Sequence, residues 1–340
     1  MNNIELIFPE IFISLSIMFL LILGVFKKDS SKIIHNISLL VLLITAVITF
    51  NETLSINPTT LFNESIIIDY LSSFMKIITL LAAFVVLLIS SNYLRTFKIF
   101  KIEYPILILS SVLGMMIMIS SNDLIVFYMG LELQSLALYV LATFNRDQLK
   151  SSEAGLKYFV LSALSSGLLL YGCSLIYGFT GSTNFNVIST QFNTNEYAIT
   201  FGIVFILVGL AFKISAVPFH MWAPDVYEGS PTSVTLFFTM VPKIAALTVF
   251  IRFLYVPFLN LIDQWQMILV FLSIASMLFG AIAAIGQKNL KRLIAYSSIS
   301  HIGYALAGLA TGSNEGIQSS VIYMTIYIIM NLGFFSCLLM

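Results

Sequence analysis

Long apolar runs, separated by short polar connections, follow one another through almost the whole chain. At about 1.5 Å per residue, a run of roughly 17 to 25 residues can cross the hydrocarbon core of a bilayer as a helix. None of the runs shows the alternation of apolar and polar residues that is typical of a membrane barrel. The sequence therefore predicts an all-α polytopic membrane protein with about eleven transmembrane helices. The runs lie at residues 11–26, 33–50, 66–92, 105–121, 123–143, 157–179, 198–222, 231–256, 264–286, 293–311 and 316–340.

The composition supports this class and excludes several others. Charged residues make up only 9% of the sequence and the mean hydropathy is +0.99, whereas about 25% of an ordinary soluble domain is charged. The 16 basic and 16 acidic residues balance, so the partner that the composition indicates is the lipid bilayer and not nucleic acid. Cys173 and Cys337 lie within apolar runs and lack metal-site spacing. The sequence also lacks a nucleotide loop, iron–sulfur spacing and a haem-ligand pattern, so we expect no cofactor bound by this chain.

Basic residues are distributed unevenly among the connections. If the N-terminus faces out, the lysines and arginines outside the spans all fall on the cytoplasmic side, so the positive-inside rule predicts this orientation. The first run follows Glu5 and Glu10 instead of a basic region, which argues against a cleaved signal peptide. The cytoplasmic basic residues are Lys27, Lys28, Lys32, Arg95, Lys98, Lys101, Arg146, Lys150, Lys157, Lys288, Lys291 and Arg292.

Four basic residues remain within the predicted spans: Lys76, Lys213, Lys243 and Arg252. Arg252 is close to the outer end of its run, so we expect it to extend toward the interface. Lys76 would either do the same or pair with Asp69, about two helical turns away. The other two lysines lie deeper and need another explanation.

Lys213, Lys243 and Glu132 are predicted near the middle of the bilayer. Counting about 1.5 Å per residue, Lys213 lies about 22 Å from the start of its run and Lys243 about 18 Å from the start of its own. Glu132 is about nine residues into the span that opens at Asp123. One interpretation is a set of ion pairs that holds helices together. Because polar contacts inside membranes contribute only about 0.6 kcal/mol on average, a proton relay is favoured.

Prolines near the two lysines are consistent with a relay. Pro218 cannot donate to the carbonyl of Ile214, and Pro242 frees the carbonyl of Phe238. Freed carbonyls inside a bundle need water or side-chain donors, so both lysines are predicted to border hydrated cavities. His220 could carry a proton from the cytoplasm, or it could be a core histidine.

Three stretches resemble a known family: "GLELQSLALYVLATF", "KISAVPFHMWAPDVYEGSPTSVTLFFTMVPKIAALTVFIRF" and "GQKNLKRLIAYSSISHIGYALAGL". They are similar to the antiporter-like membrane-arm subunits of respiratory complex I, the proton-pumping NADH:quinone oxidoreductase. The turn at Gly229, Ser230 and Pro231, and the proline directly before Lys243, favour the N branch, the counterpart of mitochondrial subunit 2. The L and M branches and the multisubunit sodium/proton antiporters differ at these positions.

The resemblance implies a fold of about fourteen helices with two inverted five-helix repeats, each containing one interrupted helix. Residues 1–104 would form an N-terminal three-helix segment, and residues 105–257 the first repeat, broken near 215–218. Residues 263–340 would form part of the second repeat. Because the sequence stops inside an apolar run without a basic anchor, we expect a fragment that lacks about three helices.

The resemblance also implies roles for individual residues. Glu132 would partner Lys213, Lys213 would exchange protons with the cytoplasmic side, and Lys243 would be the central carrier. His301 would line the path onward, with His220 as an accessory group and Pro218 as the helix break.

For the whole protein, the resemblance implies a translocase subunit without redox chemistry of its own. Partner subunits would hold NADH, FMN, iron–sulfur clusters and a quinone, and the neighbours would be antiporter-like subunit M and small subunits J and K. The location would be the bacterial inner membrane with the N-terminus periplasmic, or the mitochondrial inner membrane. The alternatives are an independent cation/proton antiporter and a scaffold subunit that does not pump.

Overall fold

The computed structural model describes residues 5–27, 30–53, 58–191 and 196–339. Lys28, one of the predicted cytoplasmic basic residues, lies outside these ranges. The long helices are α1 (Phe8–Phe26), α2 (Ser31–Thr53), α3 (Tyr70–Thr96), α4 (Glu103–Ile119), α5 (Leu124–Ala142), α6 (Leu149–Thr180), α8 (Glu196–Lys213), α10 (Thr232–Tyr255), α11 (Ile262–Ile285), α12 (Leu290–Ala310) and α13 (Asn314–Leu339). The short elements are η1 (Glu5–Ile7), β1 (Thr59–Leu61), β2 (Ile66–Ile68), α7 (Phe185–Ile188), α9 (Trp222–Gly229) and η2 (Leu259–Leu261).

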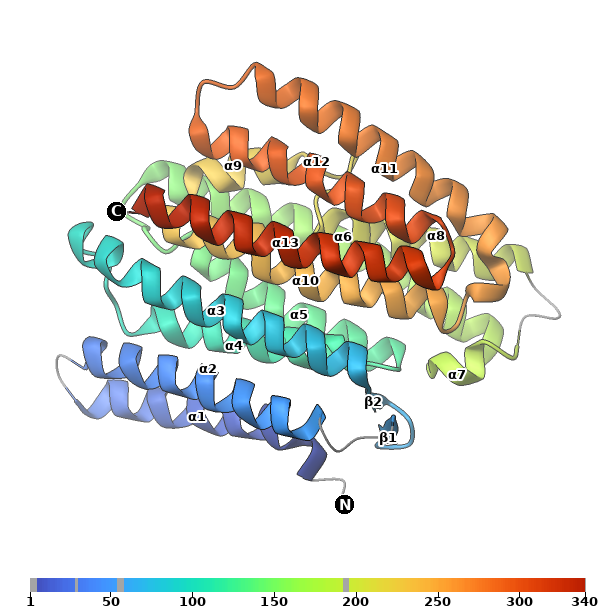
Figure 1. Cartoon of the computed structure of the whole chain (residues 1–340), viewed down its shortest axis with the longest axis horizontal. Helices are drawn as coiled ribbons and strands as arrows, with labels where there is room; N and C mark the ends of the chain where they lie inside the picture. The colour runs from blue at the N-terminus through green and yellow to red at the C-terminus, as the bar shows by residue number, and fades with distance from the viewer. Residues whose placement is uncertain (1–4, 28–29, 54–57, 192–195, 340) are drawn as a thin grey trace.

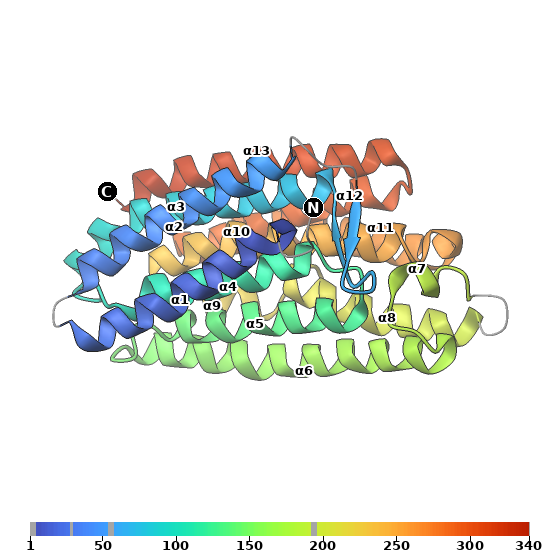
Figure 2. The ribbon, with the colours of Figure 1, turned by 90° about the horizontal axis from the view of Figure 1, so that it is seen from below.

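The helices cross the molecule in alternating directions and form one bundle (Figures 1 and 2). In the described part of the chain, nine helices are long and apolar enough to span a membrane, and α4 and α8 are shorter apolar helices. Each predicted run contains one of these elements, so the all-α polytopic class is confirmed.

Polar side chains fix where several helices begin. The Asp69 carboxylate accepts from the Ser72 amide at 2.8 Å and the Ser72 hydroxyl accepts from the Asp69 amide at 2.9 Å, which is a capping box for α3. Asp123 caps α5 in a similar way. The prediction that residues 66–92 are all helical is wrong at its start, because β2 pairs with β1 in a small antiparallel hairpin before Asp69.

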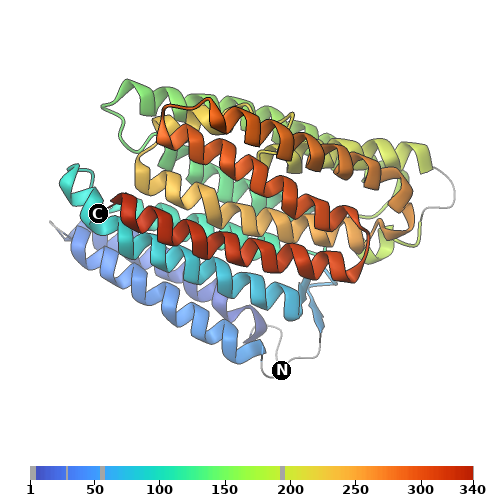
Figure 3. The same cartoon turned by 45° about the horizontal axis from the view of Figure 1, so that its top comes forward.

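Helix α10 lies in the middle of the bundle, and its membrane-spanning window is completely buried within the protein. It packs against α3, α4, α12 and α13 among others, and Figure 3 shows it lying between other long helices. Elsewhere, α1, α6 and α11 present many large apolar side chains on the surface. A helix that is surrounded by protein can carry charge at a depth where lipid contact would oppose it.

Glycines bring several pairs of helices into close contact, among them α4–α5 and α6–α8. A Cβ on Gly114 of α4 would lie 2.5 Å from the Gln134 amide nitrogen of α5, and one on Gly130 would lie 2.9 Å from the Gly114 carbonyl. Between α6 and α8, a Cβ on Gly172 would lie 2.7 Å from the carbonyl of Gly202. Small residues of this kind let helix backbones approach inside membranes. The pairs α4–α5 and α6–α8 are therefore tightly joined.

Arg252 reaches the ends of two neighbouring helices. It donates to the carboxylate of Asp69, which caps α3, at 2.5 Å and from Nε to the carbonyl of Ile119, the last residue of α4, at 2.9 Å, and it is 4% exposed. The expected pairing of Lys76 with Asp69 is wrong, because Lys76 pairs with Glu10 at 2.6 Å. Asp69, the carboxylate nearest to Lys76 in the sequence, binds Arg252 of α10 instead. The distance along the sequence does not reveal this pairing.

Candidate functional site

Helix α8 is interrupted in the middle of the bundle. It ends at Lys213, and Ser215 adopts a left-handed conformation with a φ of 60°. The amides of Ser215 and of the residue after it donate to carbonyls in the last turn of the helix, which is the Schellman arrangement. The break expected at 215–218 is present. The predicted continuation of the helix to residue 222 is wrong, because the turn at Ser215 ends it before Pro218 is reached.

Lys213 projects from the end of α8 into a group of hydroxyls. Its Nζ donates to Ser162 Oγ of α6 at 2.6 Å and to Ser135 Oγ of α5 at 2.9 Å. Ser162 Oγ also accepts from Tyr139 Oη at 2.6 Å. Only 8% of Lys213 is exposed. The buried amine is thus held by two neighbouring helices, α5 and α6, through neutral partners.

Glu132 lies on α5, one helical turn before Ser135 and therefore on the same face. The predicted partnership with Lys213 is not a direct ion pair, because no oxygen of Glu132 lies within 4.0 Å of Nζ. An electrostatic attraction between the two groups remains. Glu132 Oε1 is buried and has no hydrogen-bond partner in the described part of the chain. The carboxylate therefore acts on Lys213 across a gap.

Lys243 occupies the equivalent kind of site at the centre of α10. It is 1% exposed, and its Nζ donates to Ser298 Oγ of α12 at 2.9 Å. Ser298 in turn donates to the Ala295 carbonyl at 2.7 Å. The Tyr227 ring lies 5.9 Å from Nζ. Like Lys213, this lysine is buried next to a serine hydroxyl and not next to a carboxylate.

The proline before Lys243 has the effect that the sequence predicted. Pro242 lies inside α10 and leaves the Phe238 carbonyl without its helical donor. Tyr227 Oη, from α9, donates to this carbonyl at 3.2 Å. The freed backbone group is therefore satisfied by a side chain that also faces Lys243.

His301 lies near the Lys243 site, on the same helix as Ser298. It lies one turn after Ser298 on α12, and its Nδ1 is 2.6 Å from Tyr323 Oη of α13. It also lines a cavity of about 400 Å³ with Ser297, Ser300 and Tyr304. His301 thus lies one turn from the serine that binds Lys243 and contacts a tyrosine of α13. Its role in the path stays a prediction.

His220 is placed differently. It is 9% exposed and its ring lies 4.5 Å from the Phe279 ring of α11. Its Nδ1 is buried without a hydrogen-bond partner among the described residues. Pro218 lines an apolar cavity of about 330 Å³ on the side of α6 and α8. The apolar neighbour of His220 favours a core histidine over a proton carrier.

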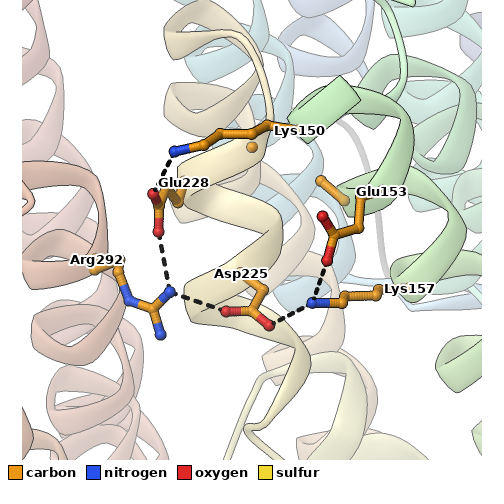
Figure 4. A pocket seen from close by; sticks show the side chains of 8 residues that line it. Lys150, Glu153, Lys157, Asp225, Glu228 and Arg292 are labelled. Atoms are coloured by element: carbon orange, nitrogen blue, oxygen red, sulfur yellow. Dashed lines mark hydrogen bonds and ion pairs between the residues drawn. The ribbon is translucent and has the colours of Figure 1, made fainter. Parts of the chain in front are cut away.

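A second group of charged residues lies at the ends of α6, α9 and α12 that the sequence predicts to face the cytoplasm (Figure 4). Arg292 donates from Nη1 to Asp225 and Glu228, both at 3.0 Å. Lys157 binds Asp225 at 3.0 Å, and Lys150 binds Glu228 at 3.3 Å. With Glu153, these side chains line a cavity of about 220 Å³. We call this group the cytoplasmic cluster.

Sequence reasoning missed the cytoplasmic cluster, although it identified all three cations as cytoplasmic. The available signal was the pair Asp225 and Glu228, three residues apart in "PDVYEG" and hence on one face of a helix. Hydrogen bonds from Arg292, and then from Lys150, hold the pKa of Glu228 below its ordinary value of 4.5. The cluster fixes α9, and with it Tyr227, against α6 and α12.

Breaking this cluster should weaken the fold moderately. Arg292→Gln removes the cation that Asp225 and Glu228 share and leaves each of them one lysine, so we expect the stability to fall by about 1 kcal/mol at neutral pH. Because the folded-state pKa of Glu228 is lowered, its contribution is present above pH 4.5 and is lost as the pH falls through the lower folded-state value. The measurement is the thermal unfolding midpoint of the protein at several pH values. A loss of the same size for Arg146→Gln, an exposed arginine outside the cluster, would contradict the assignment.

Comparisons with known proteins agree with this geometry. Residues 121–340 match the family described as NADH:quinone oxidoreductase/Mrp antiporter, TM. The chain is 76% identical to NADH-quinone oxidoreductase subunit N of Pelagibacter ubique over 340 residues, which is 100% of this chain and 72% of the relative. The chain belongs to the NADH-quinone oxidoreductase subunit N family. The preference for the N branch over the L and M branches is thus confirmed.

Solved structures place the subunit N fold in a membrane complex. A chain of respiratory complex I from Thermus thermophilus with bound aureothin superposes with a TM-score of 0.82 at 30% identity, covering 95% of this chain and 68% of that one. A chain of the Mrp complex from Dietzia sp. DQ12-45-1b has a TM-score of 0.85 at 23% identity, covering 98% and 63%. The second likeness concerns the fold alone. In this subunit N family member, the two lysines therefore lie in a membrane fold common to both kinds of complex.

Proposed function

We propose that the protein acts as a membrane-arm subunit of a proton-translocating NADH:quinone oxidoreductase. The observation that carries this proposal is the hydroxyl environment of the two buried lysines. A serine hydroxyl can accept from an ammonium and can donate to a neutral amine, whereas a carboxylate in contact would favour the charged form alone. Lys213 and Lys243 can therefore hold and release a proton without losing their partners.

In the proposed relay, Glu132 controls Lys213 from a distance and Lys243 receives the proton. A charge pair separated by about 4 Å interacts by about 4 kcal/mol at an effective dielectric near 20, and by less as the distance grows. Moving Glu132 toward Lys213 would thus favour the protonated amine, and moving it away would favour release. From Lys243, Ser298 and His301 lead toward Tyr323.

We assign the reaction to the complex and not to this chain. NADH, FMN, iron–sulfur clusters and the quinone would be bound by other subunits, with subunits M, J and K as neighbours in the membrane arm. The names of the relative and of the solved complex support this assignment. The uneven distribution of basic residues supports an N-terminus on the periplasmic side of the bacterial inner membrane. The division at residues 104 and 257, with the second repeat from residue 263, is part of the same proposal.

Two alternatives predict different behaviour. The fold that the chain shares with the Mrp complex is compatible with an independent cation/proton antiporter. A scaffold that does not pump would need the buried lysines only for contacts between helices. The scaffold would tolerate the replacement of either lysine wherever the complex still assembles.

The deciding experiment returns the full-length protein to membranes that lack it. If it is a complex subunit, NADH-driven proton uptake should recover only where the other subunits are present. The same protein alone in vesicles should show no exchange of Na⁺ or K⁺ for protons. Antiport without the other subunits would overturn the proposal in favour of the independent antiporter.

A further inference from the structure

The short helix α9 contacts both lysine sites through side-chain hydrogen bonds. At its first residue, Trp222 donates from Nε1 to the Phe212 carbonyl at 2.8 Å. Phe212 directly precedes Lys213 in the last turn of α8. Near the other end of α9, Tyr227 Oη donates to the Phe238 carbonyl of α10 at 3.2 Å. Each bond thus ends on a backbone carbonyl near one of the two lysines.

Both carbonyls belong to places where a helix departs from its regular hydrogen bonds. Lys213 is the last residue of α8 and is followed by the left-handed Ser215. In α10, Pro242 removes the helical donor of the Phe238 carbonyl. A backbone that lacks part of its helical ladder is held less firmly than a regular helix. The side chains that bind these carbonyls therefore help to fix where each lysine lies.

Aromatic rings in contact lead from one lysine to the other. Neighbouring ring centroids are 4.6 to 6.3 Å apart, which is the usual range for packed aromatic pairs. The first and last rings each lie 5.9 Å from a lysine Nζ, close enough to attract an ammonium. The series runs from Lys213 through Tyr139, Tyr158, Trp222 and Tyr227 to Lys243. Two of its four rings belong to α9.

The helix that carries these two rings is itself fixed at the cytoplasmic cluster. Salt bridges from α6 and α12 bind its carboxylates, Asp225 and Glu228. At its C-cap, Lys291 Nζ donates to the Ser230 carbonyl at 2.7 Å. The contacts of α9 thus join α6 and α12 to the end of α8 and the middle of α10.

We infer that α9 sets the separation of the Lys213 and Lys243 sites, with Trp222 and Tyr227 as positioning residues. Neither residue carries the proton, because an indole N–H only donates and the Tyr227 hydroxyl donates to a backbone carbonyl. They hold the two carbonyls, and with them the amines, at the separation that proton transfer requires. The inference rests on the proposed function, since it concerns transfer between the two lysines.

Two substitutions remove the hydrogen bonds of α9 and keep aromatic rings in place. Trp222→Phe leaves the Phe212 carbonyl its bond from the Ser215 amide at 3.0 Å, and Tyr227→Phe removes a single hydroxyl. In vesicles that contain the complex with the full-length protein, each should lower NADH-driven proton uptake per assembled complex about fivefold. The ratio of the rates in ordinary and heavy water should rise, because proton transfer becomes the slower step.

A purely structural role of the two residues predicts a different result. The amount of assembled complex would fall, whereas the rate per assembled complex and the ratio between ordinary and heavy water would stay at the wild-type values. That result would overturn the inference.

The chain offers a matched control for each substitution. Trp265, the other of the two tryptophans, is buried and donates to a carbonyl at 2.9 Å. Tyr255 Oη, at the far end of α10, donates to the Leu309 carbonyl at 2.7 Å. Trp265→Phe and Tyr255→Phe remove the same groups away from the two lysines and should leave uptake per complex unchanged. Losses as large as those at α9 would contradict the inference.

The double variant tests whether the two residues hold one separation. If they do, Trp222→Phe combined with Tyr227→Phe should lose clearly less than the product of the single losses, about twenty-fivefold. A loss equal to that product would mean that the residues act independently, against the inference.

Lys213→Ala and Lys243→Ala, measured in the same vesicles, separate this inference from the proposed function. If both lysine variants are inactive while Trp222→Phe and Tyr227→Phe work at the wild-type rate, the inference fails and the proposed function stands. If the lysine variants work at the wild-type rate, the proposed function fails and the inference fails with it.

Discussion

Lys213→Ala should abolish proton translocation and leave the complex assembled. The substitution removes a buried amine whose burial is costly, so the fold loses little. Its two partners remain satisfied, because Ser135 donates to the Leu131 carbonyl at 2.7 Å and Ser162 accepts from Tyr139. Alanine cannot hold a proton, so NADH-driven proton uptake per assembled complex should fall at least tenfold, equivalent to about 1.4 kcal/mol on the barrier. In a tightly coupled complex, quinone reduction should fall with it.

Lys213→Arg separates the relay from the scaffold. A guanidinium with a pKa above about 12 keeps the charge but does not release a proton, so it should restore little translocation. A scaffold would instead tolerate arginine, and alanine would harm it only where the complex failed to assemble. Lys98→Ala, at an exposed lysine between α3 and α4, is the control for removing a basic residue. A normal rate and a normal proton-to-electron ratio in Lys213→Ala would refute the relay through Glu132, Lys213 and Lys243.

Lys243→Ala should have an effect of the same size, for the same reason. Ser298 keeps its bond to the Ala295 carbonyl when the amine is removed, so assembly should again survive. Ser298→Ala is the complementary change, because it leaves Lys243 buried without its hydroxyl partner. We expect a partial loss of translocation together with a lower dissociation midpoint, since an unsatisfied buried polar group costs about 1–3 kcal/mol.

The comparison of the two variants identifies what Ser298 does. Ser38→Ala removes another buried hydroxyl, one that donates to the backbone of its own helix at 2.8 Å, and should leave translocation unchanged. Proton uptake is measured in vesicles and normalised to assembled complex, as for Lys213. A wild-type rate in Lys243→Ala would remove this lysine from the proposed path, whatever the result for Ser298.

The burial of Lys213 and Lys243 inside the bundle could be predicted from the sequence, because both lie within apolar runs where contact with lipid would oppose a charge. Their depth in the bilayer stays a prediction. The interruption near Pro218 could also be predicted, since proline cannot continue the hydrogen-bond ladder of a helix. The partners of the charged residues could not be predicted. Lys76 pairs with Glu10, 66 positions away along the chain. Asp69 is a nearer carboxylate in the sequence, but it binds Arg252.

The difficulty of predicting contacts between helices also explains why the predicted direct pair of Glu132 and Lys213 is wrong. A carboxylate and a lysine at one depth suggested a direct pair, but Ser135 and Ser162 lie between the helices and take the ammonium of Lys213. Serines are frequent in apolar helices and often donate to their own backbone, so their number gives no sign of which ones face a lysine. The cytoplasmic cluster was hidden for a related reason, since its members come from three helices that only the fold brings together.

The two hydrogen bonds of Lys213 differ in whether they join helices that glycine contacts already hold together. The bond from Lys213 to Ser162 lies within the tightly joined pair α6–α8, whereas the bond to Ser135 crosses to the pair α4–α5. A sliding of one pair past the other would stretch the bond to Ser135 and leave the bond to Ser162 at its length. Glu132 and Ser135 share a helix, so the same sliding would also change the distance from Glu132 to Lys213. The Lys213 amine would thus keep its hydrogen bond to Ser162 during such a movement, while its distances to Ser135 and Glu132 would change.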